Sequence, residues 1–234
     1  MPFKTDIPGW MRPEDLAVLY KLAGQVPENG SIIEFGCFLG RSTDALHKGK
    51  KQSVSLTVVD SFEINNIYPI DNDMFAIRLS EKGHEYVDGF GSPELYKLAQ
   101  DLAQSTGSWE ASFKRCVGNN LLNDIELHST FTNSFEIKKT YDMVFIDASH
   151  EFEDVVSDIG KFIENQQTLI VGDDFVHTQE GVIKAILESR RGGINNVSNK
   201  RLLIVPENSK IWIFVPVAGY WRDQFKNPNS CFFE

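Results

Sequence analysis

Three aspartates in the second half of the chain follow apolar runs and are candidate metal ligands. Asp147 ends the run YDMVFID, and Asp173 and Asp174 end the run TLIVGDD. Because the carboxyl ends of parallel strands meet at one edge of a sheet, we expect these carboxylates to lie together. Carboxylates that lie close together repel one another unless a cation lies between them, and Mg²⁺ prefers oxygen ligands. The three aspartates therefore predict a metal site. The alternative is that they cap the helices that follow.

A histidine beside the first of these aspartates is a candidate catalytic base. His150 lies three residues after Asp147. The unperturbed pKa of imidazole, about 6.5, suits removal of a proton from a substrate hydroxyl near neutral pH. Alternatively, His150 caps the following helix or contacts solvent. His177, shortly after the second acidic run, is another candidate for the same role.

A second group of candidates lies in the glycine-containing turn SIIEFGCFLGRST. Its pattern, Glu34-x-Gly36-x-x-x-Gly40, lacks the G-x-G-x-x-G of a dinucleotide-binding loop and the Lys-Ser/Thr of a Walker loop. The two glycines are expected to admit a ligand close to the backbone. Glu34 adds an acceptor that a diphosphate would repel. The turn therefore favours a ligand other than a diphosphate.

An acid at the end of the next strand indicates a nucleoside. Asp60 ends VSLTVVD, where a carboxylate can accept hydrogen bonds from both ribose hydroxyls. The same spacing also suits NAD. The structural alternative is a turn acid that only ends the strand. Aromatic side chains such as Phe38 are candidate neighbours for a positively charged cofactor.

The elements that must position these residues alternate between strand and helix. Helical spacing predicts a leading helix in RPEDLAVLYKLAGQ, and β-branched apolar runs predict buried parallel strands. The segments KRLLIV and KIWIFV predict an antiparallel hairpin at the end of the sheet. We therefore expect an α/β fold: a doubly wound, Rossmann-like, mostly parallel seven-stranded sheet with a C-terminal antiparallel hairpin and helices on both faces.

The length of 234 residues predicts a single domain, 1–234. Residues 1–30 form an N-terminal helical lead-in. Residues 61–108 are an aromatic and polar stretch without regular pattern until an amphipathic helix, and are expected to form a substrate cap or an interface. Residues 219–234 are expected to form a C-terminal tail that docks on the body or on a second subunit, in which case the protein would be a homo-oligomer.

Composition excludes several classes of protein. The net charge of −10 and the absence of a basic stripe argue against nucleic acid as a partner. No apolar run approaches the length of a membrane span, and the first ten residues lack a signal-peptide pattern. Three widely spaced cysteines suit a reducing compartment. We expect a cytoplasmic protein that acts on a small molecule.

Four segments resemble, in order and spacing, the class I S-adenosylmethionine-dependent methyltransferases. They are IIEFGCFLGRST, VVDSF, YDMVFIDASHEFEDVVSDI, and LIVGDDF followed by EGVIKAI. The likeness is strongest to the metal-dependent O-methyltransferases of the catechol and macrocin types. It implies the Rossmann-like fold with an antiparallel seventh strand.

The resemblance also implies roles for individual residues. The implied contacts of S-adenosylmethionine are Glu34, Gly36, Phe38, Gly40 and Ser42 near the methionine and ribose, Asp60 on the ribose hydroxyls, Asn133 and Ser134 beside the adenine, and Asp147. Asn133 stands where the family usually has Asp, so this position keeps an acceptor and loses a charge. The implied metal ligands are Asp147, Asp173 and Asp174.

The expected activity is transfer of a methyl group to a hydroxyl of a small molecule, such as a sugar or another natural product. Mg²⁺ or another divalent cation would orient and acidify the hydroxyl, and His150 would remove its proton. In the catechol type a Lys base stands at the position of His150, and many sugar enzymes have an Asp that Ser149 replaces here. The alternatives are an iron-dependent hydroxylase on the same scaffold, a non-catalytic nucleoside-binding protein, and an NAD-dependent oxidoreductase, which the glycine pattern disfavours.

Overall fold

The computed structural model describes residues 1–69, 75–79, 85–88, 93–163, 165–176, 179–191, 200–204 and 209–226. Four regions singled out in the sequence lie partly or wholly outside this part of the chain. They are parts of the segment 61–108, His177, the turn of the C-terminal hairpin and the tail beyond residue 226.

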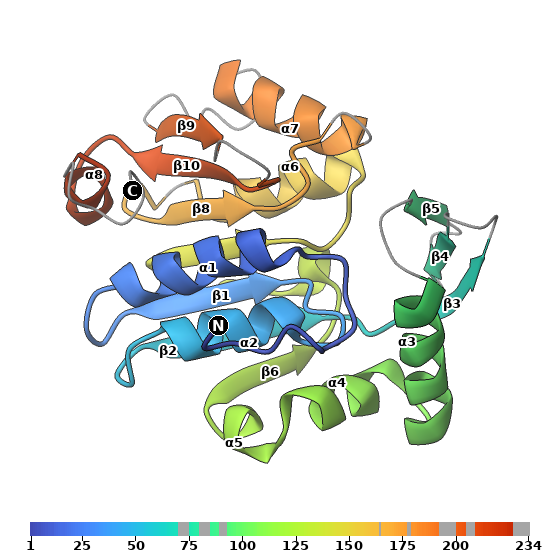
Figure 1. The fold of residues 1–234 in the computed structure, drawn as a ribbon. Helices are drawn as coiled ribbons and strands as arrows, with labels where there is room; N and C mark the ends of the chain where they lie inside the picture. Colours follow the sequence, from blue (N-terminus) through green and yellow to red (C-terminus); the bar gives the residue numbers. More distant parts are fainter. Residues whose placement is uncertain are drawn as a thin grey trace.

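The centre of the described fold is a seven-stranded sheet in the order β6-β2-β1-β7-β8-β10-β9 (Figure 1). The strands are β1 (Ser31–Phe35), β2 (Ser55–Asp60), β6 (Ile125–Ser129), β7 (Met143–Ile146), β8 (Leu169–Gly172), β9 (Lys200–Ile204) and β10 (Trp212–Pro216). The first five in spatial order are parallel, and β10 runs antiparallel to both β8 and β9. The predicted fold class, including the terminal hairpin, is confirmed.

The register of the central strands brings their ends to one level. Phe35 pairs with Ile146, and Ile146 pairs with Gly172. The residues that follow, Gly36, Asp147 and Asp173, therefore leave the sheet side by side. Strands β7 and β8 are buried along their whole length, as expected for parallel strands covered on both faces.

Helices cover both faces of this sheet (Figure 1). They are α1 (Pro13–Gln25), α2 (Arg41–Gly49), α4 (Trp109–Val117), α5 (Asn119–Leu122), α6 (Phe152–Gly160), α7 (Glu180–Arg191) and α8 (Tyr220–Gln224). Alternate residues of each strand point to opposite faces. Ile32 accordingly packs in the core beneath α1 and α2, whereas Ile33 packs in the core beneath α6 and α7.

The first helix illustrates how local sequence starts an element. Pro13 occupies the first turn of α1, where its missing N–H costs no hydrogen bond, and Glu14 adds a negative charge at the positive end of the helix dipole. Leu16 and Leu19 follow at helical spacing and are fully buried. The lead-in helix predicted from this pattern is confirmed.

The segment after β2 is more regular than its sequence indicates. It contains β3 (Ile64–Pro69), β4 (Phe75–Leu79) and β5 (Glu85–Asp88), which form a small antiparallel sheet, followed by α3 (Pro93–Thr106). The amphipathic helix is confirmed, but the expected lack of regularity before it is wrong. Asn and Pro residues lower the strand propensity of INNIYP, while pairing with β4 satisfies its backbone groups.

This small sheet and α3 stand beside the main sheet on the side toward which β1 points (Figure 1). That side is the carboxyl edge, where the candidate site residues leave the strands. The predicted role of residues 61–108 as a cap or interface stays a prediction. Within the described residues, none of the helices combines the length and apolar character that a membrane-spanning helix needs.

Candidate functional site

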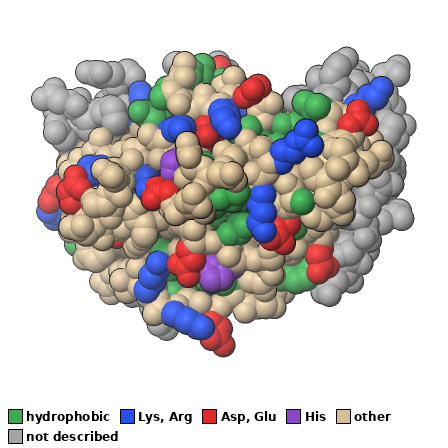
Figure 2. Space-filling model, turned by 90° about the horizontal axis from the view of Figure 1, so that it is seen from below, with side chains coloured by type: hydrophobic (Ala, Val, Ile, Leu, Met, Phe, Trp, Pro, Cys, Tyr) green, Lys and Arg blue, Asp and Glu red, His purple; other side chains and the backbone are tan. Residues whose placement is uncertain are grey.

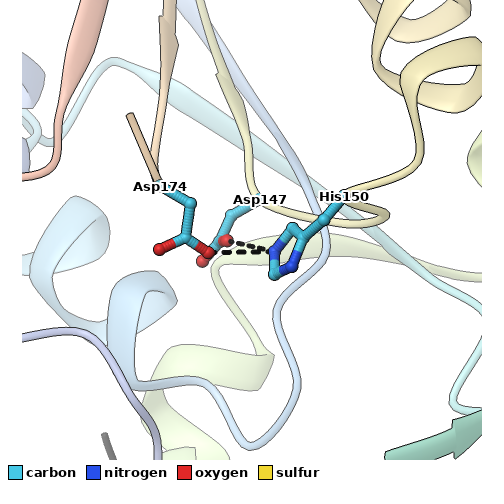
Figure 3. Close-up of side chains that lie close together, drawn as sticks. All are labelled: Asp147, His150 and Asp174. Atoms are coloured by element: carbon cyan, nitrogen blue, oxygen red, sulfur yellow. Dashed lines mark ion pairs between the residues drawn. The ribbon is translucent and has the colours of Figure 1, made fainter. Parts of the chain in front are cut away.

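Asp147, His150 and Asp174 converge at the carboxyl edge of the sheet (Figure 3). Asp147 follows β7, Asp174 follows β8 by two residues, and His150 lies in the loop before α6. His150 Nε2 lies 3.0 Å from Asp174 Oδ2 and 4.0 Å from Asp147 Oδ1. One ligand atom from each residue lies within 4.8 Å of the others. We call these three residues the DHD group.

Asp173 does not belong to the DHD group, although it was predicted as a metal ligand with its two partners. Asp174 has a φ of +63°, which turns the chain immediately after Asp173. The Asp173 side chain is buried, and its Oδ1 has no hydrogen-bond partner among the residues that the structure describes.

The main chain of Asp173 has a role of its own. Its carbonyl accepts a hydrogen bond of 2.9 Å from the indole Nε1 of Trp212. The Trp212 ring also fills the space above Gly172, where an added Cβ would lie 2.2 Å from Trp212 Cζ2. Strand β10 thereby fixes the end of β8 that carries the acids.

Helix capping does not explain the DHD group. The residue before α6 is Glu151, which makes no side-chain capping bond. Ser149 instead orders this turn: its hydroxyl accepts from the Glu151 N–H and donates to Asp154 Oδ2. Asp174 lies six residues before the first residue of α7, and other side chains bind both of its oxygens. Capping is therefore the wrong explanation for these residues.

Sequence reasoning missed a lysine at this edge. Lys210, at the start of the last hairpin strand, donates from Nζ to Asp174 Oδ1 at 3.0 Å and is 6% exposed. Its backbone N–H donates to Oδ1 of Asp15, a fully buried residue of α1. Asp15 looked like an ordinary acid of a helix start, and no local pattern marks Lys210. Only the fold joins these segments.

Charges in the DHD group are strongly coupled. Burial lowers the pKa of His150, but hydrogen bonds and charge from Asp147 and Asp174 outweigh it and raise that pKa to about 10. Burial raises the pKa of Asp174, yet His150 and Lys210 bring it well below its ordinary range. The two carboxylates therefore favour the imidazolium form of His150, and this form must lose its proton before it can act as the predicted base or bind a metal ion.

The pKa values of the other two aspartates at this edge, Asp147 and Asp173, are raised. Burial, together with the charge of Asp174, raises the pKa of Asp147 to about 6. Burial and the neighbouring aspartates raise the pKa of Asp173 well above its ordinary value. The edge thus holds carboxyls with strongly divergent pKa values, a pattern typical of functional sites.

The glycines of the turn after β1 serve packing as well as conformation. Gly36 and Gly40 have φ values of +82° and +91°. A Cβ on Gly36 would lie 2.1 Å from the carbonyl oxygen of Asp147, and one on Gly40 would lie 2.3 Å from Val117 Cγ1. The space above both residues is filled by protein. The predicted approach of a ligand to the backbone of these glycines stays a prediction.

Glu34 has partners inside the protein. It is fully buried, and its two oxygens accept hydrogen bonds from the hydroxyls of Ser42 at 2.5 Å and Thr43 at 2.6 Å. These bonds lower the pKa of Glu34, but burial is the larger effect and raises it to about 8. The pair Glu34 and Ser42, predicted to line the cofactor, thus joins β1 to the first turn of α2 and is covered in this structure.

Asp60 shapes the turn that it faces. Its Oδ2 accepts hydrogen bonds from the N–H groups of Cys37 at 2.8 Å and Phe38 at 2.9 Å. Its Oδ1 accepts one from the Phe62 N–H at 2.7 Å. Each carboxylate oxygen has two acceptor positions, so Oδ1 retains one. The predicted contact with ribose hydroxyls stays a prediction, and the remaining acceptor position of Oδ1 is the one that could make it.

Phe38 lies between two tryptophans. Its ring centroid is 4.8 Å from that of Trp10 and 5.5 Å from that of Trp109. The N-terminal segment is held there by Arg41, whose Nη1 donates to the carbonyl of Ile7. This packing gives Phe38 a structural role, and its predicted contact with a cationic cofactor stays a prediction.

Asn133 and Ser134 lie in the short 3₁₀ turn Thr132–Ser134 after β6, at the same edge of the sheet. Both are exposed, and the Ser134 hydroxyl donates to Asn133 Oδ1 at 3.1 Å. Thr132 anchors the turn by donating to Asp158 Oδ2 of α6. The turn therefore presents polar groups to solvent where the adenine contact is expected.

Comparison of the sequence with protein-family models and with curated proteins gives no match. Comparison of the structure with solved structures gives clear matches. One is the O-methyltransferase from Bacillus cereus in complex with SAH: identity 16%, TM-score 0.50, with 90% of this chain and 84% of that chain covered.

Two further structures are similar over comparable lengths. CalS11, a TDP-rhamnose 3′-O-methyltransferase of calicheamicin biosynthesis, has 13% identity and a TM-score of 0.50, with 92% of this chain and 87% of that chain covered. Cofactor-bound Rv0187 from MTB has 12% identity and a TM-score of 0.52, with 93% and 84% covered. These similarities show that the chain has the Rossmann-like fold of S-adenosylmethionine-dependent methyltransferases.

Proposed function

We propose that the protein transfers a methyl group from S-adenosylmethionine to a hydroxyl of a small molecule, with the help of a divalent metal. One observation carries this proposal. The carbonyl of Asp147 packs beneath Gly36 of the glycine turn, while the Asp147 side chain belongs to the DHD group. Asp147 therefore connects the glycine turn, which is expected to hold the nucleoside, with the DHD group, which is expected to hold the methyl acceptor.

The cofactor would lie along the turn after β1. Asp60 fixes the backbone of Cys37 and Phe38 and offers its remaining acceptor position to a ribose hydroxyl. Asn133 and Ser134 would contact the adenine. Two of the similar structures support this proposal. The Bacillus cereus O-methyltransferase is bound to SAH, and CalS11 is a methyltransferase of a sugar nucleotide.

The residues of the edge fit a divalent cation. The DHD group supplies two carboxylates and an imidazole, and the buried Oδ1 of Asp173 lacks a hydrogen-bond partner. A bound divalent ion would lower the pKa of a substrate hydroxyl and orient it.

Surface charge supports a small acceptor over a nucleic acid. Figure 2 shows one face on which Lys and Arg side chains are interspersed with Asp and Glu and form no continuous stripe. A protein that binds nucleic acid through phosphates gathers its basic residues. The net charge of −10 also argues against nucleic acid as the acceptor. We infer that the acceptor is a hydroxylated small molecule such as a sugar.

Titration calorimetry with S-adenosylmethionine and SAH, with NAD as the control ligand, tests the cofactor. We expect binding of both adenosyl ligands and none of NAD, in EDTA as well as with metal. Transfer of a labelled methyl group to a panel of hydroxylated acceptors then tests the reaction. Absence of adenosyl-ligand binding under every condition would overturn the proposal.

A further inference from the structure

We propose that His150 is a ligand of the divalent metal rather than the catalytic base, and that the site consequently selects a transition-metal ion over Mg²⁺. This inference deepens the proposed function and rests on the metal site assumed there. It concerns the identity of the ligands and of the ion. The experiment below separates its failure from that of the methyltransferase proposal.

The spacing of the DHD group matches ligands of a single ion. Two ligands at about 2.1 Å from an octahedral ion lie about 3.0 Å apart when adjacent and about 4.2 Å apart when opposite. His150 Nε2 lies 3.0 Å from Asp174 Oδ2 and 4.0 Å from Asp147 Oδ1. Figure 3 shows the imidazole directed toward both carboxylates. The three atoms that would bind the ion already face one another.

A second, independent observation comes from Asp173. Asp173 is 7% exposed, its Oδ1 has no hydrogen-bond partner among the described residues, and its carboxyl interacts electrostatically with Asp147 and Asp174. Buried acceptors without partners are rare in folded proteins and need an explanation. A hydrated divalent ion explains this one, because its water molecules are strong donors that need acceptors. Asp173 would then accept a hydrogen bond from a water molecule bound to the ion, without contacting the ion itself.

The same geometry argues against His150 as the base. A base must present a free ring nitrogen to the substrate hydroxyl. Nε2 is engaged by the two carboxylates, Nδ1 is buried, and Asp174 is in turn held by Lys210 on its other oxygen. His150 is therefore held with Nε2 toward the two carboxylates that would share the ion with it.

The donor set decides which ion is favoured. Mg²⁺ takes almost only oxygen ligands, whereas a mixed nitrogen and oxygen site binds the first-row transition ions, with an affinity that rises from Mn²⁺ through Fe²⁺, Co²⁺ and Ni²⁺ to Cu²⁺. One imidazole with two carboxylates should therefore favour these ions. Mn²⁺ is the most suitable probe because its unpaired electrons report on bound nitrogen.

The test uses metal-free protein and measures binding of Mn²⁺ and Mg²⁺ by calorimetry in the absence of cofactor. We expect one Mn²⁺ per chain, bound at least tenfold more tightly than Mg²⁺. Electron spin echo spectroscopy of the Mn²⁺ complex should show coupling to an imidazole nitrogen. In His150→Ala the coupling should vanish and Mn²⁺ affinity should fall about 10- to 100-fold.

His47→Ala is the matched control. His47 pairs with Asp124 at 3.0 Å near the opposite end of α2, so it is also a histidine on a carboxylate, but outside the DHD group. Its loss should leave Mn²⁺ binding and the nitrogen signal unchanged. The wild-type spectrum tests the inference even if His150→Ala does not fold.

Each outcome has a separate meaning. Mn²⁺ binding without nitrogen coupling, or Mg²⁺ binding as tight as that of Mn²⁺, would overturn the inference. Failure of wild-type protein to bind any metal while it binds SAH would overturn the inference and leave the cofactor proposal standing. If the protein binds Mn²⁺ with coupling to an imidazole nitrogen but binds no SAH, the inference would stand and the cofactor proposal would be overturned.

Discussion

Lys210 and Asp174 form a buried ion pair at the carboxyl edge of the sheet, with Nζ 3.0 Å from Oδ1. The other oxygen of Asp174 faces His150 at the same distance. The carboxylate is thus held from both sides by cationic groups from two distant segments, the last hairpin and the loop after β7. This arrangement orients Asp174 before any ligand binds.

Replacing Lys210 by Met should destabilise the protein by about 3 kcal/mol, because it breaks a buried ion pair and leaves Oδ1 of Asp174 without its cationic partner. The same change removes a cation that competes with a metal for Asp174, so metal affinity should rise. Urea denaturation of the metal-free protein measures the first effect, and calorimetry the second. Lys50→Met is the control, since the partner of Lys50, Asp124, is half exposed and its loss should cost about 1 kcal/mol. Equal losses in the two variants would contradict the prediction.

Glu34 should make stability depend on pH. Its pKa rises from 4.5 in the unfolded chain to about 8 in the folded protein, so between these values the folded state binds more protons. Stability therefore falls as pH rises from 4.5 to 8, by up to about 4 kcal/mol. Glu34→Gln keeps polar partners for Ser42 and Thr43 and removes the titration. Its denaturation free energy should exceed that of the wild type at pH 8 and approach it at pH 5.

Because His150 and Asp147 also titrate in this range, the difference between wild type and Glu34→Gln is the quantity to plot against pH. Glu126→Gln, at an exposed position on β6, serves as the control and should leave the slope unchanged. A difference that does not vary with pH would show that Glu34 is ionised in the folded protein.

Gly36→Ala should destabilise the protein by more than 3 kcal/mol. The new methyl group would lie 2.1 Å from the Asp147 carbonyl oxygen, and the residue would keep a left-handed backbone. Gly107→Ala separates the two causes, because Gly107 has a φ of +85° and nothing within 4 Å of an added Cβ. It should cost only about 1 kcal/mol. Thermal or urea unfolding measures both, and similar values would refute the steric argument.

Asp60→Asn should weaken SAH binding at least tenfold. An amide cannot accept at both ends, so one of the N–H groups of Cys37, Phe38 and Phe62 loses its acceptor and the turn is less well ordered. Asp142→Asn is the control: its carboxylate similarly accepts the Ser31 N–H, but at the amino end of the sheet. Calorimetry should find normal SAH affinity there. Equal weakening in both variants would trace the effect to general stability.

Much of the fold could be predicted because its signals are local. Apolar runs such as MVFI and LIVG indicate strands buried on both faces, and Pro13 with the following acids marks a helix start. The small sheet of β3, β4 and β5 could not, because its strands contain residues of low strand propensity and are stabilised by pairing with one another.

The site could be predicted only in part. Strand ends located Asp147 and Asp174, but which of two consecutive aspartates faces the group depends on how the chain turns after Gly172. Partners such as Lys210 lie far away in sequence and carry no local signal. The glycines were singled out for the approach of a ligand, whereas their close contacts with the protein follow from packing and carry no signal in the sequence.

The burial of Trp212 gives the molecule an optical reporter. Its indole is 1% exposed, lies on Gly172 and donates to the carbonyl of Asp173. Fluorescence of this ring therefore depends on the strand end that carries the acids, without an added dye. In a variant that keeps Trp212 as its single tryptophan, emission would follow events at that edge in real time, in stopped-flow as well as at equilibrium.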